Sequence, residues 1–191
     1  VVAGDIEIEK TKTLVSKYFS EVKRRPGFTR NFPKEVPITE TEKVTAYDKN
    51  IQIPAVLAAY RMPGMAERDA FVLDMISTYL SGGKSSVLYK KLVDKKKLAL
   101  EASAINLGQV DYNMFAFFAL PLGETSLDTL LSEIDEEIVK MQNELISVRD
   151  YQKLQNQFES QFVNSNSSVA GIASSLATYY LLYDNVNLIN E

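Results

Sequence analysis

The run Met114-Phe-Ala-Phe-Phe-Ala-Leu120 is one of the two longest apolar stretches of the chain. Its length and its β-favouring residues predict a strand, and four turn residues, 108–111, separate it from another candidate strand at 98–107. The two segments therefore predict a β-hairpin. A strand this apolar must be buried on both faces, with Phe115 and Phe117 on one face and Phe118 on the other.

Beyond Pro121 the pattern becomes helical up to the end of the chain. Apolar residues recur at helical spacing over 127–145. Ser147 with Asp150 resembles a capping box that starts the next helix, and a last helix is expected from Val169. Strands come first and helices follow, which predicts the α+β class: a mainly antiparallel sheet with helices on one face and a helical C-terminal part.

The N-terminal third has a less regular pattern. It predicts a strand at 1–3, a helix capped by Asp5, an extended connection over 24–40 and strands at 44–47 and 53–62. The segment 53–62 is nearly all apolar and is expected to be central in its sheet. A helix at 66–80 ends at Gly82-Gly83, and a short helix follows at 85–93. The start on Val1 without a methionine indicates a piece cut from a longer polypeptide, with 1–191 forming a single domain.

Three residue types are absent: cysteine, histidine and tryptophan. Zinc sites built on imidazole or thiolate are therefore excluded, and so is catalysis by Ser-His-Asp, Cys-His or a histidine base. Carboxylate pairs, a Ser or Thr activated by Lys, or no chemistry at all remain open. A net charge of −4 argues against a general nucleic-acid binder, and the apolar stretches are too short to span a membrane. A thiol-free chain fits the bacterial cytoplasm and the periplasm equally well.

Three local clusters of the sequence are candidate sites. The stretch 81–86, Ser-Gly-Gly-Lys-Ser-Ser, lacks the first glycine of a phosphate loop and follows a helix, so a glycine C-cap followed by a serine N-cap explains it better. The lysines at 90, 91 and 95–97 indicate a solvated helix end or, alternatively, a docking patch for an acidic partner. The acidic group at 133–137 indicates solvated surface. Ser-Lys catalysis through Lys84 is disfavoured because adjacent side chains point apart.

Residues 81–104 as a block resemble the second-domain signature of the M16 zinc metallopeptidases, the pitrilysin, insulinase and mitochondrial processing peptidase family. The block contains a Gly and Ser turn, a short helix with Leu88-Tyr89, and a charged turn that leads through Leu98-Ala99 into a strand. The start of the chain and the helices from Ser147 onward also fit this family. The resemblance implies an M16-type fold, like that of LuxS and the processing peptidases, and a single C-terminal-type domain over 1–191.

The resemblance further implies that the zinc ligands lie in another domain of the parent, since this chain has no histidine. The family's substrate-binding Arg and Tyr would fall on Val93 and Leu100, and neither of these can donate a hydrogen bond to an oxyanion. The implied function is a non-catalytic domain of a zinc endopeptidase that forms part of the substrate chamber wall. The fragment would be inactive alone and have no cofactor of its own. Two alternatives remain: a domain of a catalytically inactive M16-like subunit that acts as scaffold or substrate recogniser, and an unrelated α+β binding module.

The implied partners are a peptide substrate, the zinc-binding domain of the same chain and a second M16 half, without nucleic acid or membrane. Strand alternation from the position of the family's tyrosine nominates the chamber residues Leu100, Ala102, Ala104 and Asn106. The face of Ile105 and Leu107 is then expected to rest on the helices. Alternatively, the small side chains at 102 and 104 admit a close-packed helix on their own face.

Overall fold

The computed structural model describes residues 1–23, 27, 33 and 36–190. These residues form two compact units. One comprises residues 43–162, and the other comprises residues 1–42 together with 163–191. The first unit contains the sheet and the block that resembles the M16 signature, so most of the fold that matters for function lies in it.

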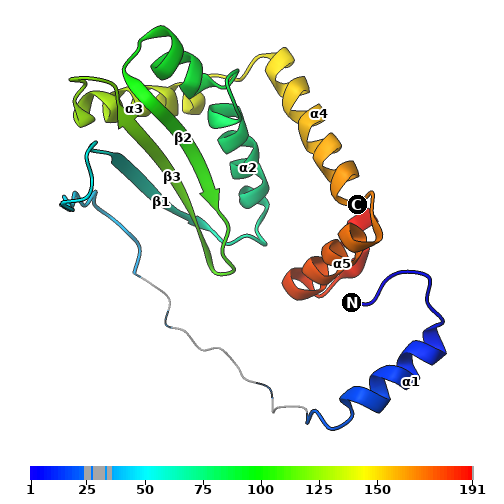
Figure 1. The fold of residues 1–191 in the computed structure, drawn as a ribbon. Helices are drawn as coiled ribbons and strands as arrows, with labels where there is room; N and C mark the ends of the chain where they lie inside the picture. Colours follow the sequence, from blue (N-terminus) through cyan, green and yellow to red (C-terminus); the bar gives the residue numbers. More distant parts are fainter. Residues whose placement is uncertain (24–26, 28–32, 34–35, 191) are drawn as a thin grey trace. The chain divides into compact units, whose positions relative to one another are not determined.

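A three-stranded antiparallel sheet forms the centre of the 43–162 unit (Figure 1). Its strands are β1 (Val56–Pro63), β2 (Ala99–Leu107) and β3 (Tyr112–Pro121), in the order β1-β3-β2. The hairpin of β2 and β3 is confirmed. The expectation that 53–62 is central is wrong: β3 pairs on both sides and holds the centre, whereas β1 pairs only with β3 among the described strands.

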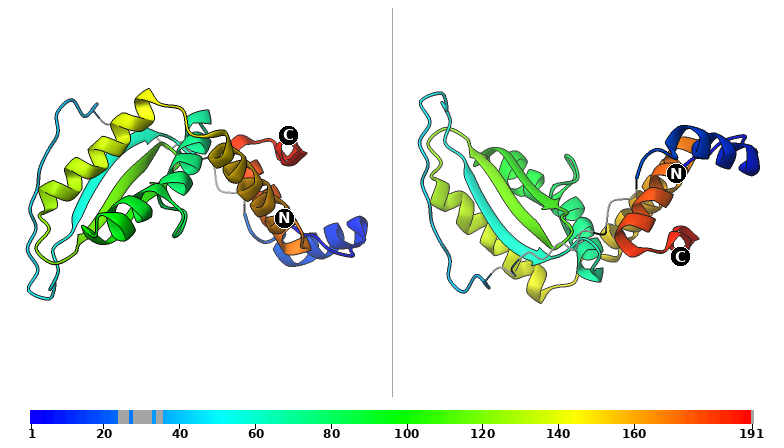
Figure 2. Two further views of the ribbon diagram at one scale, coloured as in Figure 1. Left: turned by 90° about the horizontal axis from the view of Figure 1, so that it is seen from above. Right: turned by 90° about the horizontal axis from the view of Figure 1, so that it is seen from below.

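Helices cover one face of this sheet. They are α2 (Arg68–Ser81), the wide π-helical turn η1 (Tyr89–Lys95) and α3 (Leu127–Asn143). Their buried apolar side chains form one core with Phe115 and Phe117 of β3; those from the helices are Leu73, Leu80, Leu92, Leu130 and Ile134. The strands lie side by side in both views of Figure 2. The predicted α+β class with helices on one face is confirmed.

Within the 43–162 unit, the helices leave the opposite face of the sheet uncovered. Leu57 is 64% exposed, Ile105 41% and Met114 36%, and none of the three belongs to the core cluster. Phe118 is half-buried on this side of β3, as its predicted alternation with Phe117 requires. Strand β3 is expected from its sequence to be buried on both faces. Its burial is complete only on the face that the helices cover.

Two of the remaining helices begin at the residues that the sequence predicts, and one does not. The helix α4 (Val148–Ser165) starts at the predicted capping box: the Asp150 amide donates to Ser147 Oγ at 3.1 Å, and that hydroxyl donates to the Asp150 carboxylate at 2.7 Å. The helix α5 (Val169–Tyr183) begins where predicted, with Ser168 as its cap, and a 3-10 turn, η2 (Val186–Asn190), follows. The helix α1 (Ile8–Phe19) begins after Glu7, so the Asp5 cap is wrong.

Two predicted strands, at 1–3 and 44–47, are absent from the described structure. Val44 is 87% exposed and Tyr47 93%, and neither lies in a ladder. Local β propensity does not form a strand without a partner that supplies the other half of the hydrogen bonds. The predicted extended connection at 24–40 falls largely outside the described residues. None of the described helices is long and apolar enough to cross a membrane.

Candidate functional site

The loop between α2 and η1 contains the Gly-Ser stretch. Gly82 is the C-cap of α2, and its amide donates to the Thr78 carbonyl at 2.7 Å, so the stretch follows a helix as expected. Ser86 directly precedes the first helical residue, Val87, so a serine occupies the predicted N-cap position. It makes no side-chain capping bond, because its buried hydroxyl has no hydrogen-bond partner among the described residues. Ser85 Oγ accepts a hydrogen bond from Lys153.

The next turn is wider than an α-helix. The Lys96 amide donates to the Lys91 carbonyl five residues back, and the Leu98 amide donates to the Leu92 carbonyl. Lys97 ends this turn with a φ of 54°, in the left-handed region that glycine tolerates best. The wide turn places Lys91 and Lys96 on the side that faces α3.

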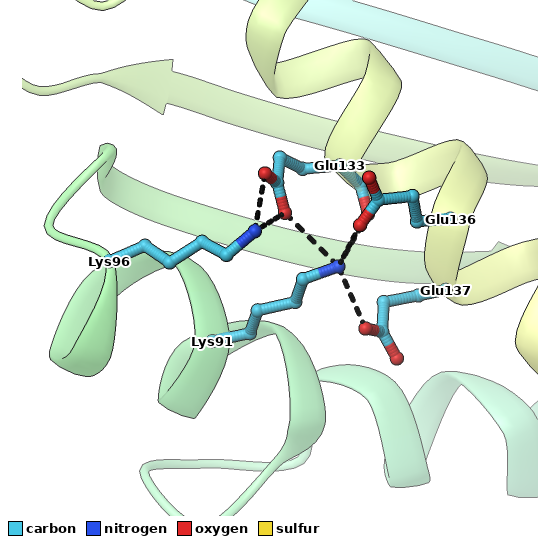
Figure 3. A network of polar contacts seen from close by, with 5 residues as sticks. All are labelled: Lys91, Lys96, Glu133, Glu136 and Glu137. Atoms are coloured by element: carbon cyan, nitrogen blue, oxygen red, sulfur yellow. Dashed lines mark hydrogen bonds and ion pairs between the residues drawn. The ribbon is translucent and has the colours of Figure 1, made fainter.

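Five charged side chains join η1 to α3 (Figure 3). Lys91 Nζ lies 3.1 Å from Glu133 Oε2, 3.0 Å from Glu136 Oε2 and 2.9 Å from Glu137 Oε1. Lys96 Nζ contacts both oxygens of Glu133, at 2.5 and 2.6 Å. We call these five residues the Lys-Glu clasp. The interpretation as solvated surface is therefore wrong for Lys91, Glu133 and Glu137, which packing of η1 on α3 largely buries, whereas Lys96 and Glu136 are exposed as expected.

The clasp shifts the pKa of two of its members. Burial by itself would lower the pKa of Lys91, but hydrogen bonds to Glu137, Glu136 and Glu133 raise it above its ordinary value. Burial would likewise raise the pKa of Glu133, but its hydrogen bonds with Lys96 and Lys91 lower it. Both pKa shifts favour the charged forms of Lys91 and Glu133, so the ion pair between these two side chains is maintained across the neutral range.

The clasp and the other acidic residues do not form a metal centre. The chain has no histidine or cysteine, and the described residues contain no group of three or more metal-binding side chains suited to an ion. The carboxylates of Glu133 and Glu137 are already bound by lysine. The residues present therefore do not fit a zinc ion.

The two positions that match the family's Arg and Tyr differ in solvent exposure. Val93 is half-buried against the core, whereas Leu100 is 47% exposed. Leu100 is the extra residue of a β-bulge: Ala99 pairs with Pro121 and Glu101 pairs with Leu120, which leaves Leu100 without a partner in the ladder.

The other chamber candidates lie on the helix-covered face. Ala102 and Ala104 are buried, and the Ala104 carbonyl accepts a hydrogen bond from Ser81 Oγ of α2 at 2.7 Å. Asn106 Nδ2 donates to Asp74 Oδ1, also of α2, at 2.7 Å. The expectation that Ile105 and Leu107 rest on the helices is wrong, since both are exposed. The small side chains at 102 and 104 allow helix α2 to pack closely on their face, as the alternative interpretation predicts.

The open face is ordered in rows across the three strands, because directly paired residues of an antiparallel sheet share a face. One row holds Arg61, Met114 and Leu107, the next Ala59, Ala116 and Ile105, and the third Leu57, Phe118 and Ser103. Seven of these nine side chains are apolar, and the other two are Arg61 and Ser103. This face is therefore mostly apolar, with a positive charge at one end. The alternation of side chains along each strand identifies the residues of this face. It does not show which of the two faces the helices cover.

The chain matches the family profile described as "Peptidase M16 inactive domain" over residues 1–158. It is 26% identical over 186 residues to "Zinc protease PqqE" of Helicobacter pylori, covering 96% of this chain and 42% of that protein. Among solved structures, a protease from Helicobacter pylori superposes with a TM-score of 0.86 and 25% identity, covering 97% of this chain and 45% of the other. The periplasmic protease PqqL of Escherichia coli gives 0.76 and 18%, covering 98% of this chain and 21% of the other. The chain thus spans less than half the length of these relatives.

Proposed function

The chain belongs to the peptidase M16 family, in the part described as the inactive domain, and we propose that residues 1–191 form one non-catalytic domain of a zinc-dependent endopeptidase. In this proposal the domain forms part of the wall of the chamber that holds the peptide. The zinc-binding domain lies elsewhere in the same parent chain, and a second M16 half completes the chamber.

One observation carries this proposal: an apolar sheet face is left open while helices cover the other face. Leu57, Ile105 and Met114 keep between a third and two thirds of their surface exposed. An exposed apolar surface of this kind marks a contact with a partner or a ligand. In the described part of the chain no strand pairs with the outer edges of β1 and β2, and an extended peptide can pair with such an edge through its main chain. Ala102, Ala104 and Asn106 lie on the face that the helices cover, so the wall role passes to the rows around Ala116.

A photo-crosslinking experiment on the full-length parent tests the wall role. A benzoylphenylalanine placed at Ile105 should capture a bound biotinylated substrate peptide. The matched control replaces Lys140, which is exposed on helix α3 at the other side of the sheet. Equal capture at both positions, or capture at Lys140 alone, would exclude the wall role.

The name of the Helicobacter relative supports zinc in the parent, although not in this chain. The 191-residue chain alone should then hold no zinc after dialysis and hydrolyse no peptide. Bound zinc in a 1:1 ratio, with turnover, would contradict the proposal. The description of PqqL as periplasmic favours the periplasm over the cytoplasm for the parent, which fractionation of the producing bacterium would test.

The alternative is a domain of a catalytically inactive M16-like subunit that serves as scaffold or substrate recogniser. Val93 and Leu100 cannot replace the family's hydrogen-bond donors, and this loss is compatible with an inactive subunit as well as with the zinc-bearing half of an active enzyme. The two possibilities differ in one measurement. Purified full-length parent with zinc, assayed together with its co-purifying partners, cleaves unfolded peptides in the first case and binds them uncleaved in the second.

A further inference from the structure

A small polar cavity of about 80 Å³ lies between α2, the loop before η1 and the first turns of α4. All of these residues belong to the 43–162 unit. The lining is mostly polar: Thr78, Tyr79, Ser85, Val87, Lys90, Asp150, Lys153, Leu154 and Gln157. None of them belongs to the open sheet face, so this cavity is independent of the proposed chamber wall.

A hydrogen bond between residues far apart in sequence holds one side of the cavity. Lys153 Nζ lies 2.5 Å from Ser85 Oγ. An ammonium group can only donate, so the serine oxygen is the acceptor and its own proton remains available. Within the described part of the chain, Ser85 makes no other side-chain hydrogen bond. The pair therefore offers a hydroxyl donor beside a positive charge.

The charges of the lining are unbalanced. Lys90 and Lys153 form no ion pair with any described residue, in contrast to Lys91 and Lys96 of the clasp. One carboxylate, Asp150, lines the cavity, and it already accepts a hydrogen bond from Ser147 Oγ. Two ammonium groups against one carboxylate leave a local charge of +1 in a protein whose net charge is −4.

We propose that this cavity binds a single carboxylate group, supplied by an acidic side chain of a peptide segment on a partner protein. Lys90 and Lys153 would pair with its charge, and the Ser85 hydroxyl would donate to one of its oxygens. A volume of about 80 Å³ leaves room for a carboxylate group. A doubly charged phosphate would exceed the local charge and face the Asp150 carboxylate, so the cavity favours the monoanion.

Titrations of the isotope-labelled 191-residue chain followed by amide NMR shifts test this assignment. The probes are acetate, the peptides Gly-Glu-Gly and Gly-Gln-Gly with both ends blocked, and inorganic phosphate at pH 8. We expect saturable shifts at Ser85, Lys90 and Gln157 with acetate and with the Glu peptide, and none with the Gln peptide. Lys153→Met should weaken binding about fivefold and Lys153→Arg should retain it.

Lys95→Met is the matched control. Lys95 is exposed and lies in η1, as Lys90 does, but it does not line the cavity. Equal weakening by Lys95→Met and Lys153→Met would show non-specific attraction and overturn the site. Tighter binding of phosphate than of acetate would overturn the carboxylate class. Binding of acetate without binding of the Glu peptide would overturn the peptide as its source. Unchanged thermal melting of each variant verifies that it is folded.

Discussion

Lys91 is the residue whose removal should cost the most outside the apolar core. Its ammonium group contacts three carboxylates, and two of these, on Glu133 and Glu137, are nearly buried. Lys91→Met leaves these negative charges facing one another, so we expect a loss of about 2–3 kcal/mol in the free energy of unfolding, less than for a fully buried pair. Urea unfolding at pH 7 measures it. The exposed Lys95→Met should change the value by less than about 0.5 kcal/mol, and an equal loss in both variants would contradict the clasp.

The clasp also predicts how stability depends on pH. The pKa of Glu133 is lower in the folded state than in the unfolded chain, so its contribution is complete above the unfolded carboxyl pKa and is lost as the pH falls through the folded value. The pKa of Lys91 is raised, so its contribution is complete below the unfolded lysine pKa and is lost as the pH rises through the folded value.

Glu133→Gln should therefore destabilise the protein at pH 7, and the difference should shrink as the pH falls through the lowered pKa of Glu133. Urea unfolding of both proteins at a series of pH values gives the difference. A difference that does not change as the pH falls would show that Glu133 acts through packing and not through its charge.

Lys97 offers a substitution that should stabilise the protein. Its φ of 54° strains any residue with a Cβ, and its ion pair with Asp94, 3.6 Å away, is exposed and contributes little. Lys97→Gly should raise the free energy of unfolding by up to about 1 kcal/mol, the usual penalty of a left-handed non-glycine residue. A thermal melt measures this gain. Lys95→Gly, inside the turn, is the control and should be destabilising.

At the scale of elements, the bulge in β2 makes a deletion test possible. Leu100 is the extra residue between Ala99 and Glu101, so its removal leaves every other β2 residue on its present face. We expect the Leu100 deletion to fold with the same spectrum. Deletion of Ser103 shifts the register by one and turns one half of the strand over, which should abolish folding. Circular dichroism and tryptic resistance distinguish the two, and equal disruption by both deletions would contradict the bulge.

At the scale of the whole molecule, the open sheet face should make the isolated chain bind apolar dyes. Ile105→Lys should reduce dye binding and change the free energy of unfolding by less than about 1 kcal/mol, because the side chain is exposed. Ala104→Lys places the same charge on the helix side, where Ala104 is 5% exposed, and should unfold the protein. Equal effects of the two would contradict the assignment of faces.

Features that depend on neighbours in sequence were predictable from the residues alone. The hairpin of β2 and β3, the capping box at Ser147 and the start of α5 follow from turn chemistry, helix caps and apolar periodicity, which act within a few residues. The absence of histidine and cysteine likewise excluded an imidazole or thiolate metal site without any structure. The family resemblance also came from the order of local motifs.

Features that depend on which elements meet were decided by the tertiary structure. Alternation along β2 correctly places Ala104 and Ile105 on opposite faces of the sheet. It does not determine which face the helices cover. In the structure, α2 packs on the face with the small residues. The lysines of η1 and the glutamates of α3 looked like two solvated surfaces because about forty residues separate them, and only packing brings Lys91 to Glu133. The segment 44–47 has strand-like residues and no strand, because a ladder needs a partner that local sequence does not provide.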